Sequence, residues 1–138
     1  MMPYRPEQFV EVAEALQALG IPQGEGRYRT ITGRAYYGAF WATCEALCAN
    51  QHINPPVSFY HEPLCDTLAK YPGDEHVREY GNLLNSLRQQ RVHADYKLRN
   101  GHDEDTSDDA IADARHLLAM LPTVAAQFPR ITPPPPRS

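Results

Sequence analysis

The segment from Tyr28 to Asn50 constrains the fold more than any other part of the chain, because it is apolar or small on nearly every side of a helical wheel. Its apolar and small side chains include Ile31, Ala35, Tyr36, Tyr37, Phe40, Trp41, Cys44 and Leu47. A helix that is hydrophobic all round is normally buried among other elements. The sequence therefore predicts a helical bundle with this segment as its central helix.

Four further segments are predicted to be helical. They are Pro6 to Leu19, Ser58 to Lys70, Asp74 to a point within Ser86 to Asn100, and a segment that begins after Thr106 or Ser107 and reaches Pro122. Two glycines predict a loop over Gln23 to Arg27, Asp74 is a suitable N-cap, and Pro122 is expected to kink or end the last helix. We predict an all-α, up-and-down bundle of about five helices, formed as one domain by residues 1–128.

A proline-rich tail over residues 129–138 follows the predicted bundle. Its last part, Ile131-Thr-Pro-Pro-Pro-Pro-Arg-Ser138, has polyproline character. Such a segment is either disordered or a short ligand for an aromatic groove. A plain disordered tail is the simpler expectation.

The charge of the chain limits the partners it can have. The net charge of −4 argues against a protein that coats nucleic acid through bulk charge. Charge is nevertheless segregated: Arg78 to Arg99 holds five basic residues against two acids, and Asp103 to Asp113 holds six acids and no Lys or Arg. A local basic site is compatible with this pattern, and the acidic run is expected to form a solvated loop and helix start.

The sequence shows no pattern for export or membrane insertion. The N-terminal residues lack a basic segment followed by an apolar one, and no apolar run approaches the length of a membrane span. The three cysteines are an odd number, as expected for reduced thiols in a cytosol. We therefore expect a cytoplasmic protein without a membrane partner.

The stretch SLRQQRVHADYKLRN, Ser86 to Asn100, concentrates cationic and proton-active groups where the fourth predicted helix runs into a loop. An α-helix advances about 100° per residue, so Arg91 falls on the apolar stripe and Asp95 lies one turn later on the same side. An unpaired charge on a buried face costs several kcal/mol. We expect Arg91 and Asp95 to form a structural ion pair, with Arg34 of the second predicted helix as its third member.

Arg88 and His93 point instead to chemistry on a phosphodiester. They are separated by about 140° on a continuous helix, so we expect them to share a site only where the helix unwinds near His93 or across a two-fold dimer. Arginine holds phosphate through its planar fork, and histidine is the natural acid or base near neutral pH. Together they suit metal-independent cleavage of RNA, although His93 taken alone would be an ordinary exposed histidine.

Two motifs resemble those of HEPN domains, the "higher eukaryotes and prokaryotes nucleotide-binding" helical family. Arg34-Ala-Tyr-Tyr-Gly-Ala-Phe40 matches the family's Arg-Ala-Tyr-Tyr-small-small-Phe run. Arg91-Val-His-Ala-Asp-Tyr96 matches its Arg-x-x-Ala-Asp-Tyr signature. The resemblance covers roughly Gln8 to Phe128 and implies a HEPN-like bundle.

Many HEPN proteins are metal-independent ribonucleases with an Arg followed, after a short spacer, by a His, and Arg88 and His93 fit that pattern with four residues between them. The resemblance implies a cofactor-free endoribonuclease that leaves 2′,3′-cyclic phosphate ends. It further implies a homodimer with a composite site in which Arg88 and His93 are the active pair. The position after the Arg is often Asn, Asp or His in active members, and here it is Gln89, which can still form hydrogen bonds.

The resemblance also implies a biological setting. In bacterial toxin–antitoxin pairs, a HEPN toxin is accompanied by a small nucleotidyltransferase antitoxin of the MNT type. In some pairs the antitoxin adenylylates a tyrosine just beyond the active histidine. Tyr96 is the nearest candidate in this chain, and packing beside Asp95 is its other expected role.

Other interpretations stay open. The chain could be a non-catalytic HEPN module that binds a nucleotide or a partner protein through the same groove, or an accessory subunit anchored by its proline tail. Potential zinc ligands lie on two adjacent predicted helices, namely Cys44, Cys48, His52, His61 and Cys65. Structural zinc sites more often use close Cys-x-x-Cys pairs, so we expect small buried thiols and no metal. His76, His102 and His116 are expected at the surface.

Overall fold

The computed structural model describes residues 5–19, 24–96 and 104–135, with side chains given for all of these except 24–27, 94–96, 104 and 105. Its elements are α1 (Pro6–Ala18), α2 (Gly24–Asn50), α3 (His61–Ala69), α4 (Glu75–Tyr96), α5 (Glu104–Val124) and the short 3₁₀ helix η1 (Ala125–Gln127). These ranges contain no β-strand, so the predicted all-α bundle is confirmed. Within them, no helix has the length and apolar character needed to cross a bilayer.

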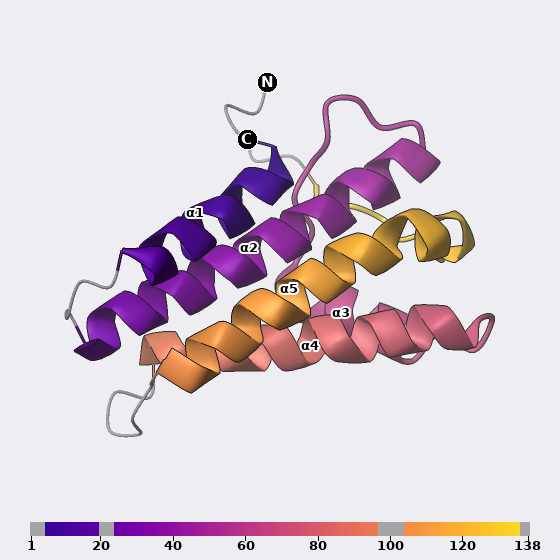
Figure 1. The fold of residues 1–138 in the computed structure, drawn as a ribbon. Helices are drawn as coiled ribbons and strands as arrows, with labels where there is room; N and C mark the ends of the chain where they lie inside the picture. Colours follow the sequence, from indigo (N-terminus) through magenta and orange to yellow (C-terminus); the bar gives the residue numbers. More distant parts are fainter. Residues whose placement is uncertain (1–4, 20–23, 97–103, 136–138) are drawn as a thin grey trace.

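The four long helices lie side by side in the order α1, α2, α5 and α4, and α3 lies behind them (Figure 1). α2 contacts α1, α4 and α5, whereas α3 packs mainly against α4. The buried side chains of α2 are Ile31, Thr32, Ala35, Tyr36, Ala39, Phe40, Ala42, Thr43, Cys44, Leu47 and Cys48. α2 is therefore the central helix, as its all-round apolar sequence predicts. Tyr37 is an exception, since it is 43% exposed and lies against Phe9 of α1 with 4.8 Å between ring centroids.

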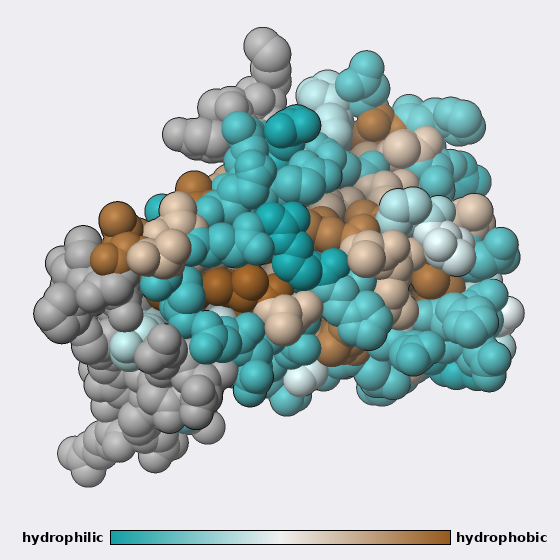
Figure 2. Space-filling view, viewed as in Figure 1, coloured by the Kyte–Doolittle hydropathy of each residue, from teal (hydrophilic) through white to brown (hydrophobic). Residues whose placement is uncertain are grey.

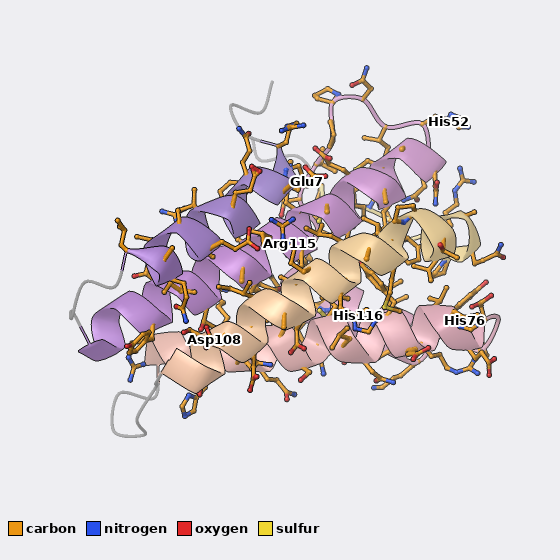
Figure 3. The ribbon with its side chains drawn as sticks, in the orientation of Figure 1. Glu7, His52, His76, Asp108, Arg115 and His116 are labelled. Carbon is orange, nitrogen blue, oxygen red and sulfur yellow. The ribbon has the colours of Figure 1, made fainter. Side chains whose placement is uncertain are left out.

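The face shown in Figure 2 is mostly hydrophilic, with short hydrophobic strips between the helices. On this face Arg115 of α5 points towards α1 (Figure 3). Its guanidinium donates hydrogen bonds to the two carboxylate oxygens of Glu14, at 3.1 and 2.5 Å, and lowers the pKa of that carboxyl. An exposed pair of this kind contributes about 0–1 kcal/mol. The buried apolar contacts, rather than this ion pair, therefore hold α1 against the bundle.

Several helix boundaries differ from the predicted ones. α2 begins at Gly24, inside the predicted loop, because a glycine in a helix costs only about 1 kcal/mol relative to alanine and the burial of Ile31 and Thr32 anchors the following turns. α3 begins at His61 instead of Ser58, which places Pro63 in the first turn, where its missing N–H would have no helical partner. α5 begins at Glu104, three or four residues before the predicted start.

Two end signals behave differently in the structure. Asp74 caps α4 as predicted, since its Oδ1 accepts the backbone N–H groups of His76 at 2.8 Å and Val77 at 3.0 Å. Pro122 lies inside α5, which continues for two more residues to Val124. The proline therefore does not end the helix at its own position. A proline removes one backbone hydrogen bond of the preceding turn. So close to the end of a helix, that loss shortens the helix by little.

The contact between α3 and α4 depends on a glycine. A Cβ placed on Gly81 would lie 2.7 Å from Leu68 Cβ and would overlap the backbone of Leu68 and Ala69. Only a residue without a side chain lets the C-terminal end of α3 approach α4 this closely. The approach fixes α3 along the same helix that carries Arg88.

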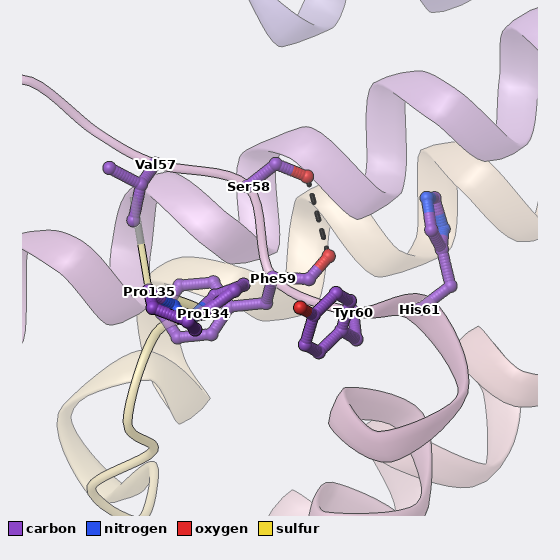
Figure 4. A pocket seen from close by; sticks show the side chains of 7 residues that line it. All are labelled: Val57, Ser58, Phe59, Tyr60, His61, Pro134 and Pro135. Atoms are coloured by element: carbon purple, nitrogen blue, oxygen red, sulfur yellow. Dashed lines mark hydrogen bonds between the residues drawn. The ribbon is translucent and has the colours of Figure 1, made fainter. Parts of the chain in front are cut away.

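The proline-rich tail lies against the bundle as far as Pro135, where its description ends. Phe128 packs beside Tyr80, with 5.5 Å between ring centroids, and Ile131 packs on the core. A pocket of about 370 Å³ is lined by Val57, Ser58, Phe59, Tyr60, His61, Pro134 and Pro135, and Figure 4 shows the two prolines on the side away from His61. The expectation of a plain disordered tail is wrong for this part, because its apolar side chains find an aromatic surface on their own chain.

Candidate functional site

α4 carries the predicted catalytic pair on one continuous helix. The helix runs unbroken from Glu75 to Tyr96 and includes both Arg88 and His93. Of the two arrangements considered for this pair, the one in which the helix unwinds near His93 is therefore wrong. Arg29 Nη1 of α2 donates to the backbone carbonyl of His93 at 3.4 Å, and a cation is favourable near the C-terminal end of a helix.

Arg88 and His93 line one surface depression of about 310 Å³, together with Gln89 and Val92. On a helical wheel these four positions span an arc of about 140°, with Val92 about 40° from Arg88. Val92 and Gln89 lie between Arg88 and His93 on the wheel. Both predicted residues therefore line one depression, at opposite ends of this arc.

Side chains of α3 and α4 lie beside the Arg88 guanidinium. Its Nε donates to Asn85 Oδ1 at 3.0 Å, three residues earlier on α4. The Arg88 guanidinium also lies near the thiol of Cys65 on α3, close enough to lower the pKa of that thiol. Cys65 is fully buried, and burial raises the pKa of its thiol to about 12, an effect that the nearby Arg88 partly opposes. The thiol therefore stays neutral near pH 7.

Arg91 faces the core side of α4. It is half-buried, and its guanidinium carbon lies 5.9 Å from the ring centroid of Tyr36 on α2, within reach of a cation–π interaction. The side chain of Asp95, its predicted ion-pair partner, lies outside the described residues.

The structure does not bring Arg34 to Arg91. Arg34 is exposed and lines a groove of about 280 Å³ with Gln8, Phe9 and Val12 of α1. Two positions turn the α2 wheel by about 200°, which places Arg34 about 160° from Tyr36, so Arg34 is turned away from the side on which Arg91 meets Tyr36. Arg34, which the sequence predicted to lie with the buried ion pair, instead lies at the surface beside α1.

His61 does not line the depression but lies near Arg91 and Arg88, and sequence reasoning considered it only as a metal ligand. Its Nδ1 and the Tyr36 hydroxyl are hydrogen-bonded at 2.6 Å, and its ring stacks on Phe40 with 3.9 Å between centroids. Burial, followed by the charges of Arg91 and Arg88, lowers the pKa of its imidazole. His61 is therefore held neutral beside two guanidinium groups.

The signals for this contact in the sequence are weak. Tyr36 lies within the HEPN-like run, and His61 stands at the start of a predicted helix, but 25 positions separate them. Burial also raises the pKa of the Tyr36 hydroxyl far above its ordinary value, so this group acts as a hydrogen-bond partner and not as an ionised phenolate.

The potential zinc ligands are used in other ways. Cys44, Cys48 and Cys65 are buried free thiols, and Cys48 Sγ accepts the Val57 N–H at 3.3 Å. In the described part of the chain, no three His, Cys, Asp or Glu side chains are grouped so as to hold a metal ion. His52 is exposed in the loop after α2.

The remaining predicted groups are the surface histidines, the acidic run and Tyr96. His76 and His116 are exposed, as predicted, and Figure 3 shows them, with His52, well apart from one another. In the acidic run, Asp108 and Asp109 are exposed, whereas Asp113 accepts a hydrogen bond from Gln90 Nε2 of α4 at 3.1 Å. The side chain of Tyr96, the predicted adenylylation site, and the whole of His102 lie outside the described residues.

Three comparisons with known proteins gave no match. No protein-family model, curated protein or solved structure matches the chain. The functional argument therefore depends on the residues of the site itself.

Proposed function

We propose that the chain is a metal-independent endoribonuclease of the HEPN type, acting in the cytoplasm as a homodimer and serving as the toxin of a toxin–antitoxin or defence module. The observation that supports this proposal most strongly is that Arg88 and His93 line the same depression on α4. The resemblance to HEPN domains is the second support, since Arg88 and His93 fit the family's pattern of an Arg followed after a short spacer by a His.

The proposed reaction is an internal transfer at phosphorus. The imidazole of His93 takes the proton from a 2′-hydroxyl, and the 2′-oxygen forms a bond to the adjacent phosphorus. Arg88 stabilises the negative charge that builds up on the phosphate oxygens. The bond to the 5′-oxygen breaks, and a protonated group supplies the proton that this oxygen needs to leave. The products carry a 2′,3′-cyclic phosphate and a 5′-hydroxyl.

The homodimer supplies the second proton carrier. Among the described residues that line the depression, His93 carries the one imidazole, the side-chain group that most often transfers protons in enzymes. If the ends of two α4 helices face each other across a two-fold axis, one His93 acts as base and its twin as acid. Each positioned acid or base of this kind contributes roughly 10²–10⁴-fold in rate.

An MNT-type nucleotidyltransferase is the proposed antitoxin. Tyr96 follows His93 by three residues, so both belong to the last turn of α4. Transfer of an adenylyl group to the Tyr96 hydroxyl would add a phosphate charge next to the proposed site. That charge would compete with RNA for Arg88.

A second candidate function is a non-catalytic module that binds a nucleotide or a partner protein. It is favoured by the single imidazole in the described lining, since a site that only binds needs no second proton carrier. A depression of about 310 Å³ falls within the size range of small-molecule sites.

Replacement of His93 by Ala separates the two functions. The ribonuclease predicts a loss of cleavage and toxicity of at least about 100-fold with an unchanged melting temperature, and Arg88→Ala should have a similar effect through lost charge stabilisation. His116→Ala is a matched control, because His116 is exposed on α5 away from the depression. Full toxicity and full cleavage by the His93→Ala protein would instead support the binding module.

A further inference from the structure

The two groups described beside the Arg88 guanidinium, the Asn85 amide and the Cys65 thiol, are both uncharged. Asn85 offers an amide oxygen to Nε at 3.0 Å, and Cys65 offers a thiol that burial keeps protonated. The described contacts of Arg88 include no carboxylate. The side chain is half-buried and lines the depression, so these contacts restrict the direction of its guanidinium without closing it off from an incoming anion.

Neutral partners preserve what a phosphate site requires. A carboxylate at the position of the Asn85 amide would pair with the guanidinium in a charge-assisted bond, and an incoming phosphate would have to displace it. An amide accepts the same N–H without cancelling the positive charge. The Asn85 amide thus orients the Arg88 guanidinium before a phosphate binds, and the full positive charge stays free to interact with the phosphate.

We propose that Asn85 is a positioning residue for Arg88 and that, with Cys65, it forms a neutral cradle that reserves the Arg88 charge for a phosphodiester of single-stranded RNA. This inference rests on the proposed function for the identity of the anion. It extends that function by naming a residue outside the HEPN-like motifs and the chemical reason for its type.

Asn85→Asp tests the charge argument, because it changes the shape of the side chain little and adds the carboxylate that the cradle lacks. The probe is a fluorescent 2′-O-methyl RNA of random sequence, which cannot be cleaved because its 2′-oxygen is blocked. We expect Asn85→Asp to weaken binding of this probe by at least 10-fold at low salt while the melting temperature stays the same or rises. The slope of log K against log salt concentration should fall by about 0.7, the value of one lost phosphate contact on a single strand.

Asn82→Asp is the matched control. Asn82 is exposed on α4, about two turns before Arg88, so it adds the same charge to the same helix without reaching the guanidinium. It should leave the salt slope unchanged. Asn85→Ser keeps the position neutral and should lose about 3-fold or less in affinity, which provides a second measurement should Asn85→Asp fail to fold.

The outcomes separate this inference from the proposed function. If Asn85→Asp and Asn82→Asp bind the probe equally, or if Asn85→Ser loses as much affinity as Asn85→Asp, the neutral cradle is wrong, whatever the wild-type protein does to RNA. If the wild type binds the probe with the expected variant pattern but leaves cleavable RNA intact, the ribonuclease is wrong and the cradle stands. If the wild type does not bind the probe at low salt, both are overturned.

Discussion

His61 is kept neutral by its surroundings, although it lies near two cations. Its Nδ1 is paired with the Tyr36 hydroxyl at 2.6 Å, so a tyrosine that donates this bond requires an unprotonated Nδ1. Burial and the charges of Arg91 and Arg88 both disfavour the imidazolium form. At the scale of single residues, the junction of α2, α3 and α4 therefore places its cations beside neutral groups.

This environment predicts a pH dependence of stability. The pKa of His61 is lowered in the folded state relative to about 6.5 in the unfolded chain, so at mildly acidic pH the unfolded state binds more protons. The contribution of His61 to the free energy of unfolding should be complete above about pH 6.5 and should decrease as the pH falls below that value. Thermal unfolding of wild type and His61→Gln between pH 8 and 5 measures this contribution.

The exposed His76 provides the control for the pH series. His76→Gln removes an imidazole that is exposed on α4, so its stability should follow the wild-type curve. The His61→Gln protein should lose less stability than the wild type on acidification. A His61→Gln protein with the same pH dependence as the wild type would show that His61 is not held neutral by folding.

Individual residue contacts could be predicted from the sequence only where they are local. The Asp74 cap depends on residues two and three positions away, and the sequence identifies it directly. The hydrogen bond of Tyr36 to His61 and the proximity of Arg88 to Cys65 join positions more than twenty residues apart. They depend on how α3 docks on α4, which no periodicity in the chain specifies.

α3 is the shortest α-helix of the described chain, and it places two residues of the junction, His61 and Cys65. At the scale of elements, its position depends on the close approach at Gly81, where a Cβ would overlap the backbone of Leu68 and Ala69. The sequence predicts α2 as the central helix because its pattern is apolar all round. It does not predict this glycine contact, because Gly81 alone gives no sign of what lies against it.

Gly81→Ala should destabilise the protein by about 1–3 kcal/mol, since the added methyl group overpacks the contact between α3 and α4. Chemical denaturation with urea measures the change. Cleavage by the variant should also fall, because a displaced α3 moves Cys65 away from Arg88.

Gly33→Ala is the matched control for this prediction. Gly33 is a helical glycine on α2, and nothing lies within 4 Å of the position that an added Cβ would take. The substitution should stabilise the protein by about 0.5–1 kcal/mol through helix propensity alone. Equal effects of the two alanines would contradict the close approach of α3 and α4.

At the scale of the whole molecule, the proposed chemistry needs a second copy. A single protomer places one imidazole in the described lining of the depression, whereas the proposed transfer needs one group to accept a proton and another to donate one. The all-α bundle could be predicted from the sequence. The partner surface could not, because the α4 pattern places Arg88 and His93 at the surface without saying what faces them.

The proposed dimer predicts a specific pattern of spin-label distances. Gln89 and His76 are both exposed, and about 20 Å of α4 separates them along the helix axis. If the C-terminal ends of two α4 helices face each other, labels on Gln89→Cys should show a short distance between protomers, and labels on His76→Cys a clearly longer one. The three native cysteines are buried, so they should take up little label.

Pulsed electron paramagnetic resonance on the purified protein provides both distances. A protein without measurable coupling at either position, or with its short distance at His76→Cys, would rule out the composite site as drawn.

The central claim is that Arg88 and His93 cleave RNA by internal transfer without a metal ion. Mass analysis of RNA ends after incubation with the pure protein in excess EDTA tests it most directly. We expect fragments with 2′,3′-cyclic phosphate and 5′-hydroxyl ends, formed by the wild type and absent with His93→Ala. Intact RNA in EDTA, or cleavage that appears only when Mg²⁺ is added, would contradict the account.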